Sequence, residues 1–150
     1  VTSSLERAGL LKLNDAEVAV VAGIVFGKEL PVPEFARRVI PACGLRACLV
    51  TLGERGVFAA EAGGGQVYAP GYRVKVVDTV GSGDAFSAGF IHSWLAGGSL
   101  AEACDFGNRL GALVAATAGA TARITTEEIE RIGQSGERIA DPAFEESDAN

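Results

Sequence analysis

The sequence has no methionine, a single histidine and a single tryptophan among its 150 residues. It also lacks a secretory leader and any long apolar run, so the pattern indicates neither export nor membrane insertion. Lys and Arg number 13 against 19 Asp and Glu, and the net charge of −6 argues against nucleic acid or a membrane surface as partner. The absent methionine predicts a piece of a longer protein, because a complete gene product begins with one.

Cysteine is scarce, and its spacing argues against a metal or redox site. The three residues, Cys43, Cys48 and Cys104, are odd in number and contain no Cys-x-x-Cys pair. We therefore expect reduced, partly buried thiols in a cytoplasmic protein.

Glycine, by contrast, is abundant at 20 residues, and its most informative cluster is Gly81-Ser82-Gly83-Asp84. The apolar run Val74–Val77 precedes the cluster, and small and apolar residues typical of a helix follow it. A strand, a glycine turn and a helix start would place free backbone N–H groups around one point, at the positive end of the helix dipole. Such a point binds phosphate or a developing anion, and the Asp84 carboxylate beside it could accept a hydroxyl proton. An anion cradle with an adjacent base indicates phosphoryl transfer.

Two other glycine motifs are excluded for this cluster, and one alternative interpretation remains open. A dinucleotide-binding fingerprint requires a third glycine where Phe86 stands, and a P-loop requires a Gly-Lys-Ser/Thr tripeptide that the chain lacks. The plain alternative is an ordinary helix start in which Asp84 only favours the dipole. The local pattern leaves that alternative open.

The rest of the chain reads as alternating helices and strands. The expected elements are a helix over 14–23 capped by Asn14 and Glu17, a proline-opened helix over 34–42, a buried parallel strand over 46–52, a hairpin over 56–61 and 66–69, a strand over 74–77, a helix over 84–96, a helix capped by Ser99 and Glu102 that ends near 118, and a short helix over 126–132. This order predicts a layered α/β domain with a mainly parallel sheet. Ligands of such sheets bind beyond the carboxyl ends of the strands, where Gly53 and Gly81 fall. The polar, acidic segment after Gly133 predicts a frayed tail.

Single polar residues on the later helices have plain interpretations. His92 is expected to pack or to lie on a helix surface, Arg109 to be a solvated helix arginine, and Asp105 to be a surface charge.

The glycine cluster resembles the C-terminal signature of the PfkB (ribokinase-like) carbohydrate kinases, Asp-Thr-x-Gly-Ala-Gly-Asp. Asp78, Thr79, Gly81, Gly83 and Asp84 match it, and Ser82 replaces the commoner alanine. Three more segments resemble family motifs in the expected order: 13–17 (Asn-x-x-Glu), 50–57 (Thr-Leu-Gly-x-x-Gly), and 107–120 with Gly107-Asn108, Gly111-Ala112 and Gly119-Ala120. The four segments cover roughly residues 5 to 125, and together they make the resemblance specific.

The resemblance implies transfer of the γ-phosphoryl group of ATP to a sugar hydroxyl. The implied roles are Asp84 as base, the amides of Gly81, Ser82 and Gly83 as anion hole, Asn14 and Glu17 as Mg²⁺ ligands through water, Thr51, Gly53 and Gly56 as walls of the nucleotide cleft, Asn108 at the adenine, and Asp78 near a monovalent cation such as K⁺. An N-cap remains the alternative role for Asn14 and Glu17.

The implied fold is a three-layer α/β/α ribokinase-like domain, of which this chain is the C-terminal half. Residues 1–132 would form the ATP-binding part and 133–150 an acidic tail. The missing N-terminal half would carry the sugar-binding glycines and a lid, and the full-length protein would be able to form a homodimer. Residues 11–14 and 111–114 lean toward fructokinase-like members. The alternatives are a nucleoside or vitamin-precursor kinase of the same fold, or a non-catalytic fragment that binds nucleotide.

Overall fold

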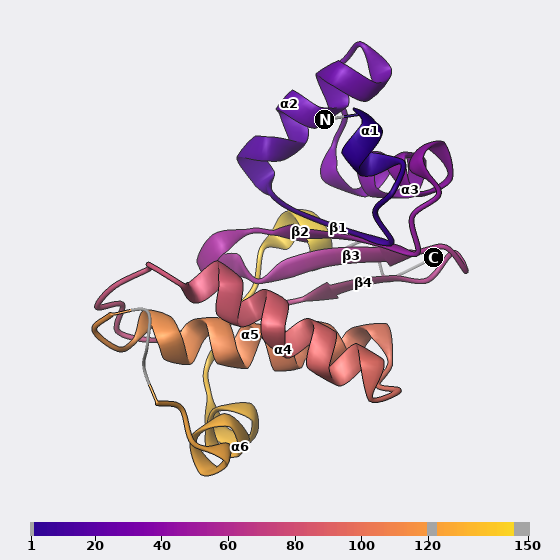
Figure 1. Cartoon of the computed structure of the whole chain (residues 1–150). Coiled ribbons are helices and arrows are strands. Elements are labelled where there is room, and N and C mark those ends of the chain that lie inside the picture. The colour runs from indigo at the N-terminus through magenta and orange to yellow at the C-terminus, as the bar shows by residue number, and fades with distance from the viewer. Residues whose placement is uncertain (1, 120–122, 146–150) are drawn as a thin grey trace.

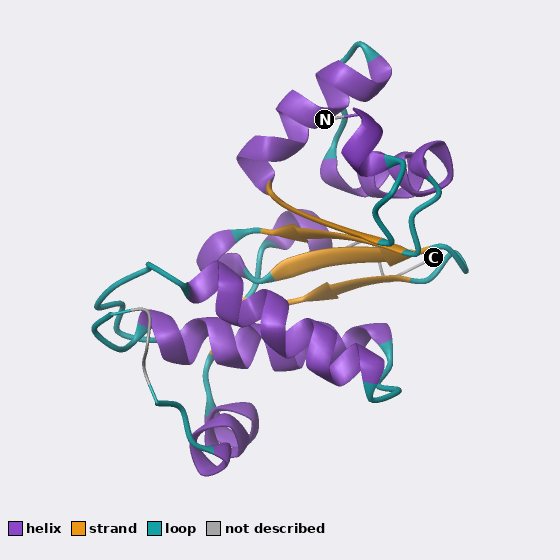
Figure 2. Ribbon diagram, viewed as in Figure 1, coloured by secondary structure: helices purple, strands orange, loops and turns teal. Residues whose placement is uncertain are grey.

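The computed structural model describes residues 2–119 and 123–145, which form three layers (Figure 1). A central sheet has the strand order β1-β2-β3-β4. Helices α1–α3 cover one face of this sheet, and α4 and α5 lie side by side across the other (Figures 1 and 2). The α/β class expected from the sequence is confirmed.

The sheet is mixed. Strand β1 (Leu10–Asn14) runs parallel to β2 (Ala47–Thr51), and the hairpin of β3 (Val57–Glu61) and β4 (Gln66–Ala69) continues the sheet with two antiparallel pairings. The expected hairpin and the parallel setting of β2 are therefore confirmed. Strand β1 was not foreseen, although its apolar residues directly precede the cap of the next helix.

Two helices begin at the expected capping residues, α2 after Asn14 and α5 after Ser99. The bounds of the helices are α1 (Thr2–Leu5), α2 (Asp15–Phe26), α3 (Val32–Cys43), α4 (Ser82–Leu95), α5 (Leu100–Ala115), α6 (Thr126–Ser135) and α7 (Pro142–Glu145). Asn14, Ser99 and Thr125 each close a capping box with a glutamate three residues later, so two orphan N–H groups are bonded at each helix start.

Two apolar clusters hold the helical layers to the sheet, and side-chain alternation along the strands separates them. In β2, Cys48 and Val50 face the cluster under α2 and α3, which contains Phe35, Val39 and Phe58 among others. Leu49 faces the opposite cluster, under α4 and α5, which includes Val57, Phe86, Phe90 and Cys104. The sheet is thus buried on both faces, as the three layers require.

The strand expected over 74–77 is wrong. These residues follow β5 (Gly71–Tyr72) as an irregular segment, and Val76 and Val77 are 53% and 57% exposed. The backbone N–H groups of Val77 and Asp78 both donate to the carbonyl of Ala115 at the end of α5, at 2.8 and 3.2 Å. A β-branched run becomes a strand only where a neighbouring strand pairs with it, and here a single helix carbonyl takes that place.

The frayed tail expected after Gly133 is wrong for the described residues. Strand β6 (Arg138–Ile139) pairs antiparallel with β5, and α7 follows. Phe144 packs against Phe58 and Tyr68, with ring centroids 5.7 and 5.4 Å apart. One buried aromatic ring is enough to fix a short polar segment. Residues 146–150 lie outside the described part.

The three cysteines are free thiols, as expected. Burial raises the pKa of Cys48 and of Cys104 to about 12, so neither forms a thiolate near neutral pH. Among the described residues, no helix has the length and apolarity needed to cross a bilayer.

Candidate active site

A cleft of about 590 Å³ opens where β1 and β2 end and α4 begins. Its wall comes from five parts of the chain: the β1–α2 junction, the turn after β2, β5 with the segment that follows it, the first turns of α4, and the middle of α5. The carboxyl ends of parallel strands and a helix start meet at this point, which is the usual ligand position in α/β folds.

Seven predicted site residues line this cleft: Asn14, Thr51, Gly53, Gly56, Ser82, Gly83 and Asn108. Gly81, Asp84, Glu17 and Asp78 are not among its lining residues. Gly81 and Asp84 belong to the start of α4, Glu17 to the first turn of α2, and Asp78 to the turn before α4.

The start of α4 has no side-chain cap. Gly81 is the N-cap residue, with a left-handed φ of 83° that favours glycine. Ser82 N–H donates to the carbonyl of Thr79 at 3.2 Å, whereas the N–H groups of Gly83 and Asp84 have no acceptor among the described residues. Free N–H groups at a helix start, reinforced by the dipole, are suited to bind an anion.

Asp84 is the third residue of α4, since the helix begins at Ser82, two residues earlier than expected. Its carboxylate is exposed and makes no hydrogen bond or ion pair with any described residue. It is therefore available to accept a proton from a hydroxyl held beside the glycine turn.

Asn14 and Glu17 form a complete capping box. The Asn14 Oδ1 accepts from Glu17 N–H at 2.8 Å, and Glu17 Oε2 accepts from Asn14 N–H at 2.8 Å. The alternative interpretation of this motif, an N-cap, is thus realised in the structure. The box leaves Oε1 of Glu17 without a partner in the described part of the chain.

Gly56 is required by the protein's own backbone. Its φ is 97°, and an added Cβ would overlap the carbonyl of Ala69 and lie 2.6 Å from Gly71 N. Its close neighbour is the chain entering β5, and Gly56 also lines the cleft. Gly53, with φ of 63° and open space around its Cβ position, leaves room on the cleft side.

Asn108 is 8% exposed and joins α5 to the chain between β4 and β5. Its Nδ2 donates to the carbonyls of Ala69 and Pro70, at 2.9 and 3.1 Å. Thr51 plays a similar part, because its hydroxyl donates to the Leu13 carbonyl at 3.2 Å and ties the ends of β2 and β1. Both residues shape the cleft wall while their donors are used within the protein.

Asp78 shapes the turn before α4. Its Oδ1 accepts from Val80 N–H at 2.9 Å, which is an Asx turn. The predicted role beside a monovalent cation is not tested by this geometry.

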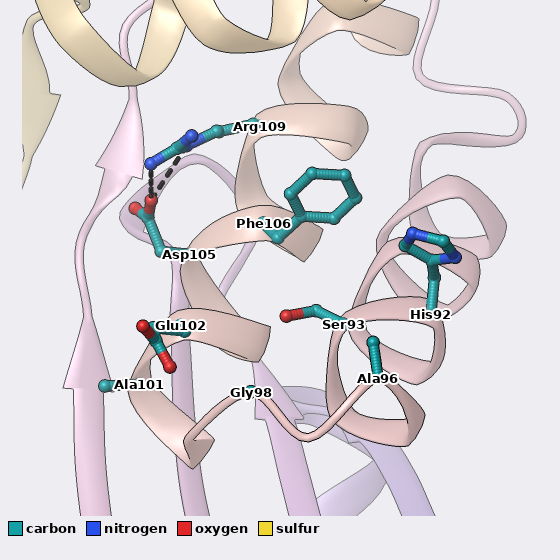
Figure 3. Close-up of a pocket in the computed structure, with 9 residues that line it drawn as sticks. All are labelled: His92, Ser93, Ala96, Gly98, Ala101, Glu102, Asp105, Phe106 and Arg109. Atoms are coloured by element: carbon teal, nitrogen blue, oxygen red, sulfur yellow. Dashed lines mark hydrogen bonds and ion pairs between the residues drawn. The ribbon is translucent and has the colours of Figure 1, made fainter.

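A second, shallower groove of about 630 Å³ lies between α4 and α5 (Figure 3). The ring of His92 packs against Phe106 with centroids 5.8 Å apart, and Arg109 turns its guanidinium to Asp105, with Nε 2.8 Å from Oδ2. Asp105 also accepts from Tyr72 and Arg138, so the expectation of a free surface charge is wrong. Burial alone would raise the pKa of Asp105, but the bonds from Arg138 and Tyr72 outweigh it and lower the pKa.

Several lining residues were missed by sequence reasoning. Val74 and Val76 line the cleft from the irregular segment, and Phe86 from the second turn of α4. The sequence did contain signals that could have predicted them. Val74 and Val76 are two residues apart, so they point to the same side of an extended segment, and Phe86 stands four residues after Ser82, on the same face of the helix. Tyr72 and Asp15 carried no such signal, because only the tertiary fold brings them to the cleft.

Comparison with known proteins shows to which family the chain belongs. The sequence matches the pfkB family carbohydrate kinase domain over residues 2–127. The chain belongs to this family. A ribokinase of Haemophilus influenzae is 30% identical over 124 residues, and an ATP-dependent ribose-1-phosphate kinase of Halopiger xanaduensis is 45% identical over 60 residues.

The fold comparison agrees with the family. The crystal structure of a ribokinase from Thermotoga maritima superposes with a TM-score of 0.79 at 25% identity, covering 90% of this chain and 45% of the other. The ribokinase-like fold is therefore confirmed. The Haemophilus match covers 83% of this chain and 40% of that protein, and the Halopiger match covers 40% and 20%, so this pfkB chain spans less than half of these relatives.

Proposed function

We propose that this chain is the ATP-binding part of a sugar kinase of the pfkB family and that Asp84 is its base. The observation that carries the proposal is the open start of α4. There a free carboxylate and unbonded backbone N–H groups stand together within one turn, beside the cleft at the ends of β1 and β2. Family membership supplies the reaction class, phosphoryl transfer from ATP to a hydroxyl.

In this proposal the acceptor hydroxyl donates its proton to Asp84 and attacks the terminal phosphorus of ATP. The oxygen–phosphorus bond to the acceptor forms as the bond to the ADP oxygen breaks, and ADP leaves. The N–H groups at Gly81–Gly83 stabilise the charge on the transferred group, with the largest part from Gly83, whose N–H is free. One preorganised donor of this kind is worth about 3 kcal/mol of barrier.

The nucleotide would lie along the rest of the cleft. Thr51, Gly53, Gly56 and Asn108 all line it. Asn108 already gives its N–H donors to two carbonyls, so its contribution to adenine binding would be its position and its carbonyl oxygen.

The Asn14–Glu17 box fits a magnesium ion held through water. One Glu17 oxygen is fixed by the helix backbone, and the other is left for an outer ligand. Mg²⁺ commonly keeps several waters and binds through one or two carboxylates and substrate phosphates. Consistent with that mode, the described residues contain no cluster of three or more His, Cys, Asp or Glu ligands. When bound, the ion would neutralise phosphate charge. Asp78 remains the proposed neighbour of a monovalent cation such as K⁺.

A second candidate is nucleotide binding without turnover by this chain alone. It is favoured by one observation: the chain covers only 40% to 45% of the ribokinases it matches. The sugar, and whether the acceptor is a nucleoside or vitamin precursor instead, would then be decided by the other half of a longer protein, as would a homodimer.

The deciding experiment measures ADP release with magnesium-ATP and a panel of fructose, ribose and 2-keto-3-deoxygluconate. Asp84→Asn should lower turnover by about 10²- to 10⁴-fold, the range of a general base, while ATP affinity stays within about twofold. The matched control is Glu102→Gln, an acid at the same position of α5 and outside the cleft.

Each result has a distinct meaning. Turnover that depends on Asp84 supports the kinase. Binding without turnover by the wild-type chain supports the second candidate. Equal loss of binding and turnover in Asp84→Asn would mean that Asp84 is structural, and absence of nucleotide binding in the wild type would overturn both candidates.

A further inference from the structure

Lys12 stands on β1 with its side chain on the α4 side of the sheet. Its neighbours Leu11 and Leu13 join the apolar cluster under α2 and α3, whereas Leu10 joins the cluster under α4 and α5. Because side chains alternate along a strand, Lys12 shares the face of Leu10. It also stands two residues before Asn14, which lines the cleft.

The ammonium group reaches the glycine turn. A methyl group added at Gly83 would lie 3.4 Å from Nζ of Lys12. Gly83 is the second residue of α4, and its N–H and that of Asp84 are without an acceptor in the described residues. A full positive charge thus stands beside the donors proposed to hold the transferred phosphoryl group.

The charge of Lys12 has no partner within the described protein. Lys12 is half-buried, yet it makes no ion pair or hydrogen bond there. Arg55, which lies between the cleft residues Glu54 and Gly56, is by contrast neutralised by Asp15 and Asp141. Holding an unpaired ammonium on an apolar sheet face is costly unless an anion joins it. In a chain of net charge −6, such a cation is also what would attract a polyphosphate locally.

We propose that Lys12 binds the terminal phosphate of the nucleotide, together with the N–H groups of Gly83 and Asp84; this rests on the proposed function. Lysine suits the task because its ammonium is a compact point charge on a rotatable stem, able to follow a phosphoryl group as it moves. Lys12 forms no covalent bond in this role. The rival role is that of an inward-pointing charge that blocks further pairing at the free edge of β1.

The test is calorimetric binding of two magnesium nucleotides to the 150-residue chain: ADP, and the β,γ-imido analogue of ATP. In Lys12→Met the imido analogue should bind about tenfold or more weakly, the effect of losing one charged hydrogen bond, while ADP changes less than about twofold. Lys12→Arg should recover part of the loss. Lys28→Met, an exposed lysine after α2 and outside the cleft, is the matched control.

Three results would overturn the proposal, and they separate it from the proposed function. If Lys12→Met binds both nucleotides like the wild type, Lys12 is an edge-strand charge and the kinase proposal stands. If the affinities for ADP and for the imido analogue fall equally in Lys12→Met, Lys12 does not bind the terminal phosphate specifically. If the wild type binds neither nucleotide, the proposed function is wrong, and this inference, which rests on it, is wrong as well. Thermal unfolding of each variant verifies that the fold is retained.

Discussion

Five of the described helices carry an acid at the third position, and they use it in three ways. In α3 the acid is Glu34, which forms an ion pair with Arg38 one turn further along the helix. In α2, α5 and α6 the acid is Glu17, Glu102 or Glu128, and its carboxylate returns to the backbone of an Asn, Ser or Thr cap. In α4 the acid is Asp84, the cap is Gly81, and no such bond forms.

The difference has two physical causes. Glycine offers no side-chain acceptor for the helix N–H groups, and its left-handed φ turns the chain away from the extended cap geometry of α2, α5 and α6. Aspartate is also one methylene shorter than glutamate. The same sequence position therefore closes a capping box in α2, α5 and α6 and leaves a free carboxylate at the start of α4, next to the cleft. A helix start that lacks a side-chain cap and borders a cleft is a good candidate for a functional site.

The largest effect should come from disturbing the open start itself. Gly81→Ala places a side chain in the left-handed region, which costs about 1–2 kcal/mol of stability, and it shifts the N–H groups that follow. We expect nucleotide affinity to fall about tenfold or more by calorimetry. Gly97→Ala is the control, because Gly97 has φ of 92°, open space around it and no place in the cleft. An equal loss of affinity in both variants would contradict the role of the turn.

A smaller effect should follow from removing the charge of Glu17, whose capping box closes the start of α2 beside the cleft. Glu17→Gln keeps an oxygen that can accept from Asn14 N–H, so unfolding stability should change by less than about 0.5 kcal/mol. The magnesium concentration for half-maximal nucleotide binding should nevertheless rise several-fold. Glu102→Gln makes the same change in the box of α5 and should leave the magnesium titration alone. An unchanged titration in Glu17→Gln would reduce its box to a helix cap.

The smallest effect concerns acid stability. The backbone N–H and then the hydroxyl of Ser99 lower the pKa of Glu102 below its ordinary value of 4.5. A carboxylate whose folded pKa is lowered contributes stability above its unfolded pKa, and this is lost as pH falls through the folded value. Below about pH 4.5 the unfolding free energy should therefore fall more steeply in the wild type than in Glu102→Gln. If the unfolding free energies of the wild type and of Glu102→Gln fall in parallel as the pH is lowered, the capping box of α5 is not formed in solution.

Features that depend on residues close together in the sequence could be predicted, whereas features that depend on contacts between distant segments could not. The capping residues Asn14 and Ser99 were predicted because a box is closed within four residues, and the hairpin because a glycine turn separates its strands. The strand over 74–77 was wrong because β-branching says nothing of whether a pairing partner is present.

The residues of the cleft divide in the same way, into those that motifs could locate and those that only the packing of distant segments reveals. Motif order located Thr51, Ser82 and Asn108 on its wall before the structure was known. The close approach that demands glycine at 56, and the reach of Lys12 to Gly83, join segments far apart in sequence. No spacing rule could have revealed either of them, because both depend on how β1, β5 and α4 are packed together.

The two hydrogen bonds of Asn108 also make this position sensitive to the change of a single chemical group. Deamidation would convert its Nδ2 from a double donor into an anionic oxygen facing the carbonyls of Ala69 and Pro70. Three acceptors would then meet with no hydrogen among them, in a place that is 8% exposed. A single chemical lesion, with almost no change of shape, would separate α5 from the chain that enters β5.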